Sequence, residues 1–220
     1  MELNGIANDD LAAALFQLLG EPVPYRLSLE SEAACLESEI GDRQKLLLKI
    51  IALCAPQETP KQLYLTEKAY SWLGKEYYEE AAQTAGAYLH TEGWKELPGY
   101  TKEEDGIPVN HAAATRASIL ADLARAQEGL GRVDAALANC MEAYRIMPHS
   151  AMYAIKAADV LLRLRGREEA LQFLLQQKKS KYYTPVKYTD VQGVTRRNDL
   201  FRQLLDAHIL KLQQKEPTDW

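Results

Sequence analysis

Small and apolar residues recur at helical spacing along residues 117–150, and they predict two antiparallel helices. Leu120, Leu123 and Ala124 share one face of the first helix. Gly131 interrupts that pattern, and Asp134 is a suitable cap for the second helix. The second helix has an apolar face and a closing proline, supplied by Ala136, Cys140, Ala143, Tyr144 and Pro148. Because alanines let two backbones approach closely, we expect the helices to cross where Ala124 meets Ala136.

The pair of alanines at this expected crossing occurs three times in the chain. Twelve residues separate Ala69 from Ala81, Ala124 from Ala136, and Ala158 from Ala170. The second and third pairs are 34 residues apart, a period typical of helical repeats. The first pair precedes the second by 55 residues, which exceeds that period by 21. The pattern therefore predicts three helical hairpins, the first of them followed by an insertion.

This unit resembles the tetratricopeptide repeat (TPR). Its small positions and closing proline are filled by Ala124, Ala136, Ala143 and Pro148, whereas Leu120 and Gln127 stand where the family has aromatic residues. The resemblance implies an all-α protein whose TPR-like antiparallel helical hairpins stack in a right-handed solenoid, with flanking N-terminal helices and a C-terminal capping helix. It also implies that the chain binds a protein or peptide and does not catalyse a reaction.

The remaining patterns divide the chain into three parts, which we expect to form one continuous domain. Residues 1–58 are expected to form N-terminal helices, and residues 28–56 also allow a degenerate repeat, because Cys35 lies 34 residues before Ala69. Residues 59–184 contain the three repeats, and Thr59 with Gln62 forms a capping box at their start. Residues 185–220 are expected to form a loop and a capping helix, whose apolar face consists of Leu200, Leu204, Ala207 and Leu210.

Two segments without helical period interrupt the helices. The long insertion at residues 90–110 contains Asp105 and Gly106, which suit the turn of a short hairpin. Residues 188–198 repeat the pattern of residues 100–110, since both stretches begin Tyr-Thr, turn at a glycine followed by a β-branched residue and end on an asparagine. The similarity predicts related loops on the same edge of the solenoid. Because such turn residues are common, two unrelated turns are an equally good interpretation.

Composition suits a globular protein, but the charge is unevenly distributed. Apolar residues make up 47% of the chain and charged residues 26%, and no apolar run is long enough to span a membrane. The three cysteines lie far apart, which favours a reducing, cytoplasmic setting. The net charge is −5, yet residues 1–60 carry −6 and residues 163–215 carry +7. The overall sign argues against a dedicated nucleic-acid protein, while the basic C-terminal third allows a local basic face.

That basic third supplies the first alternative function, which is association with nucleic acid. Basic residues and tyrosines alternate there, a mixture that could follow a phosphate backbone and stack on bases. The residues are Lys178, Lys179, Lys181, Lys187, Arg196 and Arg197 with Tyr182, Tyr183 and Tyr188. No nucleic-acid motif accompanies them, so a solvated face with packed tyrosines is the simpler interpretation. Nucleic acid is therefore not the expected partner.

Catalytic signatures are missing from the sequence. It contains no nucleophile elbow, no dinucleotide fingerprint and no phosphate loop. His90, Glu92 and His111 flank the long insertion, but their spacing is not that of paired metal ligands. We therefore expect no enzymatic activity, no metal and no cofactor. An enzyme that uses the insertion as a lid is the second alternative.

In the TPR family the first helix of each repeat lines a concave groove. The corresponding positions define the predicted peptide-binding site, which consists of Tyr70, Asp122, Arg125, Lys156, Asp159 and Arg163. Stacking of adjacent repeats would place Asp122 beside Lys156 and Arg125 beside Asp159, so that opposite charges meet. Tyr70 and Arg163 have no such counterpart, and we expect them to be the binding anchors.

Some members of the family hold the C-terminal carboxylate of a chaperone. Their ligand positions correspond to Thr66, Tyr70, Asp122, Met152 and Lys156, of which only Lys156 matches. Asp122 would repel a carboxylate, so we expect no such clamp. The sequence thus predicts a cytoplasmic scaffold that binds a protein or peptide, and it leaves the partner and the oligomeric state open.

Overall fold

The computed structural model describes residues 59–96, 101–104, 106–190 and 192–214, together with residues 44, 47, 48, 51, 52 and 54. The chain divides into two units, residues 1–84 and 85–220, and each is described by itself. The helices predicted before residue 44 lie outside the described residues, as does most of the degenerate repeat predicted at 28–56. The expected limits of the three parts, near residues 58 and 184, stay predictions.

Helix α4 (Pro60–Leu73) of the first unit begins where the sequence predicts. The Thr59 hydroxyl accepts a hydrogen bond from the Gln62 amide at 3.2 Å, and the Thr59 amide donates to Gln62 Oε1 at 3.0 Å. These two bonds form the predicted capping box. A 3-10 turn, η1 (Lys75–Tyr77), leads into α5 (Tyr78–Thr91), which continues into the second unit. Ala69 and Ala81, the first predicted pair of small residues, are both buried.

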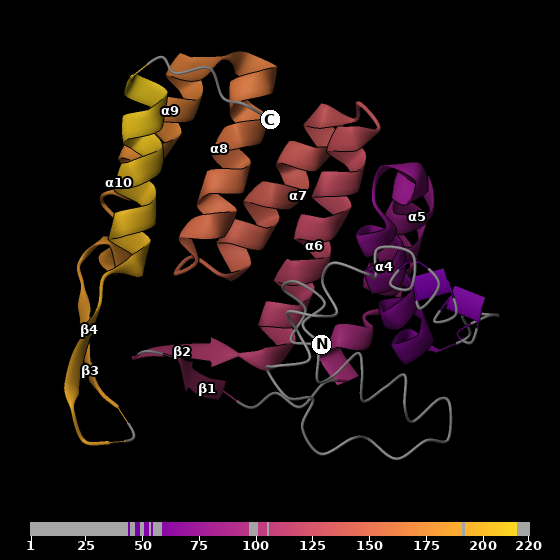
Figure 1. Cartoon of the computed structure of the whole chain (residues 1–220), viewed down its shortest axis with the longest axis horizontal. Coiled ribbons are helices and arrows are strands. Elements are labelled where there is room, and N and C mark those ends of the chain that lie inside the picture. Colours follow the sequence, from indigo (N-terminus) through magenta and orange to yellow (C-terminus); the bar gives the residue numbers. More distant parts are fainter. Residues whose placement is uncertain are drawn as a thin grey trace. The chain divides into compact units, whose positions relative to one another are not determined.

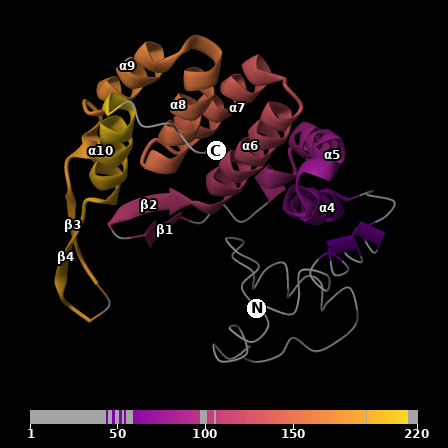
Figure 2. The ribbon, with the colours of Figure 1, turned by 45° about the horizontal axis from the view of Figure 1, so that its top comes forward.

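Helices form most of the described part of the second unit (Figures 1 and 2). They are α6 (His111–Gly129), α7 (Val133–Ile146), α8 (Ala151–Arg165), α9 (Arg167–Gln177) and α10 (Leu200–Gln213), with 3-10 turns η2 (Gly93–Glu96) and η3 (Lys181–Tyr183). Contacts join α6 to α7, α7 to α8 and α8 to α9, and α10 contacts both α8 and α9. The predicted all-α character is therefore confirmed for the described residues, apart from two small hairpins.

The turn between α6 and α7 confirms one prediction and corrects another. Gly131 has a φ of +75°, a left-handed conformation that glycine adopts without strain just after α6 ends. The prediction that Asp134 caps α7 is wrong, because α7 begins at Val133 and Arg132 takes the cap position. Asp134 lies in the first turn instead, where its carboxylate faces the positive end of the helix dipole.

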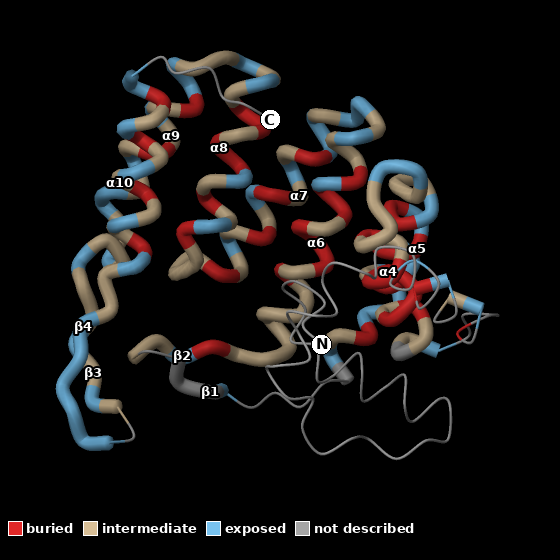
Figure 3. Tube along the Cα trace, in the orientation of Figure 1, coloured by how far each residue is buried: buried red, intermediate tan, exposed pale blue. Residues whose placement is uncertain are grey.

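The small residues predicted at the helix crossings are buried (Figure 3). Ala124 of α6 and Ala136 of α7 belong to one apolar cluster, which also contains Cys140, Ala157 and Val160. This cluster joins α6, α7 and α8. The third pair, Ala158 and Ala170, lies in the apolar cluster between α8, α9 and α10. Short side chains at all of these positions allow the helices to approach closely.

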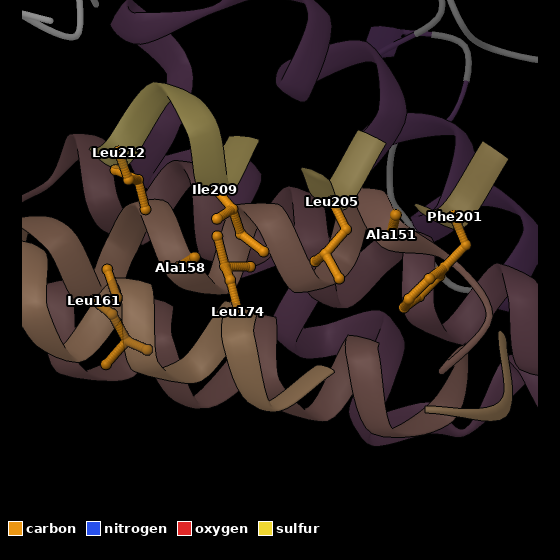
Figure 4. Packing of buried hydrophobic residues seen from close by; sticks show 9 residues of the cluster. Ala151, Ala158, Leu161, Leu174, Phe201, Leu205, Ile209 and Leu212 are labelled. Atoms are coloured by element: carbon orange, nitrogen blue, oxygen red, sulfur yellow. The ribbon is translucent and has the colours of Figure 1, made fainter. Parts of the chain in front are cut away.

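Helix α10 covers α8 and α9, but with a different face from the predicted one. Figure 4 shows the buried residues Phe201, Leu205, Ile209 and Leu212 beside apolar residues of α8 and α9. Two residues of the predicted face point outward instead, since Leu200 is 57% exposed and Leu210 is 52% exposed. The helix carries two apolar stripes whose members differ by one or two residues, so that the stripes lie at least about 100° apart around the helix. The position of α8 and α9 decides which stripe is buried.

The two segments that lack helical period form antiparallel β-hairpins. Strand β1 (Thr101–Glu104) pairs with β2 (Ile107–Asn110), as the Asp-Gly turn predicts. Strand β3 (Val186–Thr189) pairs with β4 (Thr195–Asn198). Each hairpin is followed by a helix, and Asn110 Oδ1 caps α6 by accepting a hydrogen bond from the Ala113 amide at 3.0 Å. Each segment therefore contributes to a hairpin, but the matched residues lie at different places, since Thr101 begins β1 whereas Thr189 ends β3.

Candidate functional site

A pocket of about 290 Å³ opens where the two hairpins meet the first turns of α8 and α10. β2 contributes Ile107 and Val109, which share one face of the strand because side chains alternate along it. The second hairpin contributes Val186 and Asn198. The remaining lining residues come from η3, α10 and the end of α7 through the start of α8: Met147, His149, Ser150, Ala151, Met152, Tyr153, Tyr182, Leu200, Phe201 and Leu204. All of them belong to the second unit.

Aromatic contacts hold one wall of this pocket in place. The Tyr182 ring packs edge-on against His149, with the ring centroids 5.7 Å apart, and its centroid lies 6.4 Å from that of Phe201. Phe201 in turn belongs to the buried cluster between α8, α9 and α10. In the turn before α8, the Ser150 amide donates a hydrogen bond to the Met147 carbonyl at 3.0 Å. The wall is therefore tied to the helical core, which makes the pocket a preformed site.

The lining of the pocket is more apolar than polar and carries no lysine, arginine or carboxylate. Its polar groups come from His149, Ser150, Asn198 and two tyrosines. Asn198 Oδ1 accepts a hydrogen bond from the Leu200 amide at 3.1 Å, which orients this side chain at the start of α10. At the rim, about half of the Met152 surface and more than half of the Leu200 surface are exposed. Large apolar side chains open to solvent beside a pocket favour contact with another apolar surface.

Five residues of the predicted concave site lie in the second unit, on α6 and α8, and most of them contact charged partners. Arg125 Nη2 lies 3.3 Å from Asp122 Oδ1, one turn away on the same helix. Asp159 Oδ1 lies 2.8 Å from His208 Nε2 of α10. Lys156 is exposed on α8. These contacts fit the interpretation that charges on this surface neutralise one another.

The expectation that Arg163 lacks an acidic neighbour is wrong. Its Nη1 atom lies 2.9 Å from Glu128 Oε1, so Arg163 of α8 forms an ion pair with α6. The sequence comparison missed Glu128 because it matched only equivalent positions of adjacent helices. The arginine side chain is long enough to contact Glu128, which is not at the equivalent position of α6. In the protein without a ligand, Arg163 therefore already connects α8 to α6 through an ion pair.

Tyr70, the sixth predicted residue, lies on α4 in the first unit. Its ring stacks on Tyr77, with centroids 5.9 Å apart and an interplanar angle of 26°. Burial is the main cause that raises the pKa of the Tyr70 hydroxyl, and the negative charge of Glu80 adds to the effect. Glu67, one turn before Tyr70, is fully buried and accepts a hydrogen bond from the Ser71 hydroxyl at 2.8 Å. This face of α4 is thus less open than the sequence pattern suggests.

Several basic and aromatic residues of the C-terminal third make packing contacts and ion pairs. Lys178 Nζ lies 2.8 Å from an Asp206 carboxylate oxygen, and the Tyr183 hydroxyl donates to the same carboxylate at 3.0 Å. Burial alone would raise the pKa of Asp206, but these hydrogen bonds outweigh it and lower the pKa. The hydrogen bond to Asp206 raises the pKa of Lys178. The hydrogen bond to Asp206 holds Tyr183, and packing on His149 and Phe201 holds Tyr182. These two tyrosines therefore do not form the exposed stacking platform of the nucleic-acid hypothesis.

In the described part of the chain, no group of three His, Cys, Asp or Glu side chains could hold a metal ion. The same residues include no helix with the length and apolar character needed to cross a bilayer. Comparison of the sequence with protein-family models and with curated proteins gives no match.

The pocket was not among the sites predicted from the sequence. Its residues come from six elements, and no motif connects them. The one available signal is the similarity between residues 100–110 and 188–198, which predicts loops on a common edge. The contact of Gly106 with Val186 and Tyr188 agrees with that prediction, although the similarity does not identify the lining residues.

Proposed function

We propose that this chain is a scaffold of TPR type that binds a protein or peptide and catalyses no reaction. The three alanine pairs at 12-residue spacing support the assignment, together with the burial of all six alanines. The order of contacts from α6 through α10 suits hairpins that stack in a right-handed solenoid, with α10 as the cap. Cys54 and Cys140 are buried free thiols, which suits a cytoplasmic setting.

The observation that carries the proposal is the apolar pocket between the two hairpins. It is preformed, uncharged and bordered by the exposed side chains of Met152 and Leu200. An apolar side chain of the partner would enter the pocket, while neighbouring residues of the partner would cover this rim. A few buried anchors of this kind usually supply most of the binding energy of an interface. The predicted concave surface is more polar, and its charges already meet intramolecular partners.

The proposal is tested with substitutions at the exposed rim, which leave the core intact. The wild-type chain is used to capture a partner from an extract of the source cell, and the partner is identified by mass spectrometry and purified. We expect Met152→Lys combined with Leu200→Lys to weaken its Kd at least tenfold, because charged side chains would border the apolar pocket. Circular dichroism and the melting temperature should stay near those of the wild type.

Two further variants make the test specific. Leu210→Lys is the matched control, because Leu210 is an equally exposed leucine of α10 that does not line the pocket. The double variant Arg125→Glu with Arg163→Glu probes the concave surface. If this charge reversal abolished binding of the partner while the pocket variant still bound it, the binding site would be the concave surface predicted from the sequence. Equal loss with Leu210→Lys would show that the pocket has no special role.

A further inference from the structure

The β3–β4 hairpin presents two different faces. Strand register places Lys187 opposite Arg197 and Thr189 opposite Thr195, and all four residues are exposed. Alternation along the strands puts these four residues on one face, which we call the outer face. Val186 and Tyr188 lie on the other face, against the turn of the first hairpin at Gly106. The outer face therefore points away from the contact between the hairpins.

Two like charges stand directly opposite each other on the outer face. Residues in that relationship have Cβ atoms about 5 Å apart, and like charges there destabilise a strand pair. In the described part of the chain, neither Lys187 nor Arg197 makes an ion pair. Nearby basic residues do, since Lys178 pairs with Asp206, Arg196 with Asp190 and Arg202 with Asp199. Among the described residues, the outer face thus keeps two positive charges together with no acidic partner.

The acidic residue closest in sequence is already committed elsewhere. Asp190 Oδ1 accepts hydrogen bonds from the Gln192 and Val194 amides at 2.9 Å, and its other oxygen accepts one from Arg196. The hydrogen bond from the Val194 amide is the main cause that lowers the pKa of Asp190, and the bond from Arg196 adds to it. This carboxylate shapes the turn and holds Arg196, which is in register with Tyr188 on the inner face. The negative charge of Asp190 is therefore paired with Arg196 and with the amides of the turn.

We propose that the outer face of the β3–β4 hairpin binds the phosphate backbone of a nucleic acid without reading its sequence. The face offers an arginine fork, an ammonium group and two hydroxyls, which are the groups that contact phosphate oxygens. It offers no apolar side chain for a peptide to bury. The tyrosines of this region are packed or turned inward, so base stacking contributes nothing. This contact is separate from the peptide-binding pocket, which lies on the other face of the hairpin.

A salt titration measures the number of phosphates contacted. The full chain is titrated into a labelled 20-base-pair DNA duplex of mixed sequence at several KCl concentrations, and binding is followed by fluorescence anisotropy. Two phosphate contacts contribute a slope of about −1.8 to the logarithm of affinity against the logarithm of salt, or roughly a 60-fold loss between 20 and 200 mM KCl. We expect Lys187→Glu with Arg197→Glu to lower affinity at 20 mM KCl at least tenfold and to reduce the slope by about 2.

The control is Lys75→Glu with Arg132→Glu, which changes the net charge equally at two exposed residues outside the basic C-terminal third. It should keep the wild-type slope. The proposal is overturned if the wild type does not bind the duplex at 20 mM KCl, or if the control loses as much affinity as the hairpin variant. Poly-glutamate and vesicles of phosphatidylserine are tested in parallel. If poly-glutamate or the vesicles bound as tightly as the duplex, and the hairpin variant lost as much affinity for them, the face would be assigned to acidic peptides or to membranes instead.

Discussion

Gly106 in the turn of the first hairpin lies directly against Tyr188 of the second. A Cβ atom on Gly106 would stand 2.7 Å from the Tyr188 Cβ and 3.0 Å from Val186 Cγ1. Side chains do not approach that closely, so only glycine permits this contact. The relationship joins two hairpins that are far apart in the sequence and that both contribute residues to the pocket.

We therefore expect Gly106→Ala to destabilise the second unit and to separate the hairpins. Gly106 has a φ of +81°, which costs about 1 kcal/mol for alanine, and the overlap with Tyr188 adds about 1–3 kcal/mol. Gly193→Ala is the matched control, since Gly193 has a φ of +77° and open space around it. Urea unfolding should show the larger loss for Gly106→Ala. Equal losses for both variants would mean that the hairpins are not in contact in solution.

The helix crossings give a second prediction. Ala124→Leu or Ala136→Leu should lower the free energy of unfolding by about 1–3 kcal/mol, because both methyl groups are fully packed and a larger side chain forces the helices apart. Ala135→Leu serves as the control, because Ala135 is an exposed neighbour on α7 and should tolerate leucine. A denaturant midpoint unchanged from the wild type in both crossing variants would refute the packing described here.

A third prediction concerns the contact between α8 and α10. Asp159 and His208 meet at 2.8 Å with side chains only 14% and 12% exposed. Because solvent screens this pair weakly, a double-mutant cycle with alanine at both positions should give a coupling of about 1–3 kcal/mol. The same cycle on Arg165 and Glu169, an exposed pair at 3.4 Å, should give a coupling near zero. Similar coupling in the two cycles would contradict the structural role of His208.

The fourth prediction is a loss of stability at alkaline pH. Burial raises the pKa of the Cys140 thiol from about 9 to about 11. Between these values the folded chain keeps a proton that the unfolded chain releases, so the contribution is complete below pH 9 and declines as the pH rises to 11. Two pKa units correspond to about 3 kcal/mol. Urea unfolding at pH 8 and pH 10.5 should show a smaller pH effect for Cys140→Ala than for the wild type, whereas parallel profiles would show that this thiol is accessible to water.

Short-range interactions explain which structural features the sequence predicts correctly. The capping box of Thr59 and Gln62 involves residues of a single helical turn. The Asp-Gly turn of the first hairpin and the glycine after α6 are likewise decided within a few residues. Such features follow from backbone conformation and local hydrogen bonds, which are nearly the same in any tertiary setting. The buried alanines were predictable for a related reason, since their spacing matches the crossing of two consecutive helices.

The candidate site depends on residues that no local rule brings together. The predicted concave surface was derived by matching equivalent helix positions, and this matching overlooked the Glu128 carboxylate that meets Arg163. The pocket combines strand residues, a helix start and η3, so its lining could be known only once the hairpins were placed. Its location follows from the contact between Gly106 and Tyr188, which depends on the shapes of two distant segments.

By itself, the sequence of this protein determined the helices from residue 60 onward, the first hairpin and the small residues at the helix crossings. Only the tertiary structure decided which stripe of α10 is buried, which acid meets Arg163 and where an apolar pocket opens. Periodicity specifies that a helix has an apolar side, but α10 has two nearly equivalent sides. The free energy gained by burying Phe201, Leu205, Ile209 and Leu212 against α8 and α9 selects one of them. That gain depends on where other helices lie, and therefore on the fold as a whole.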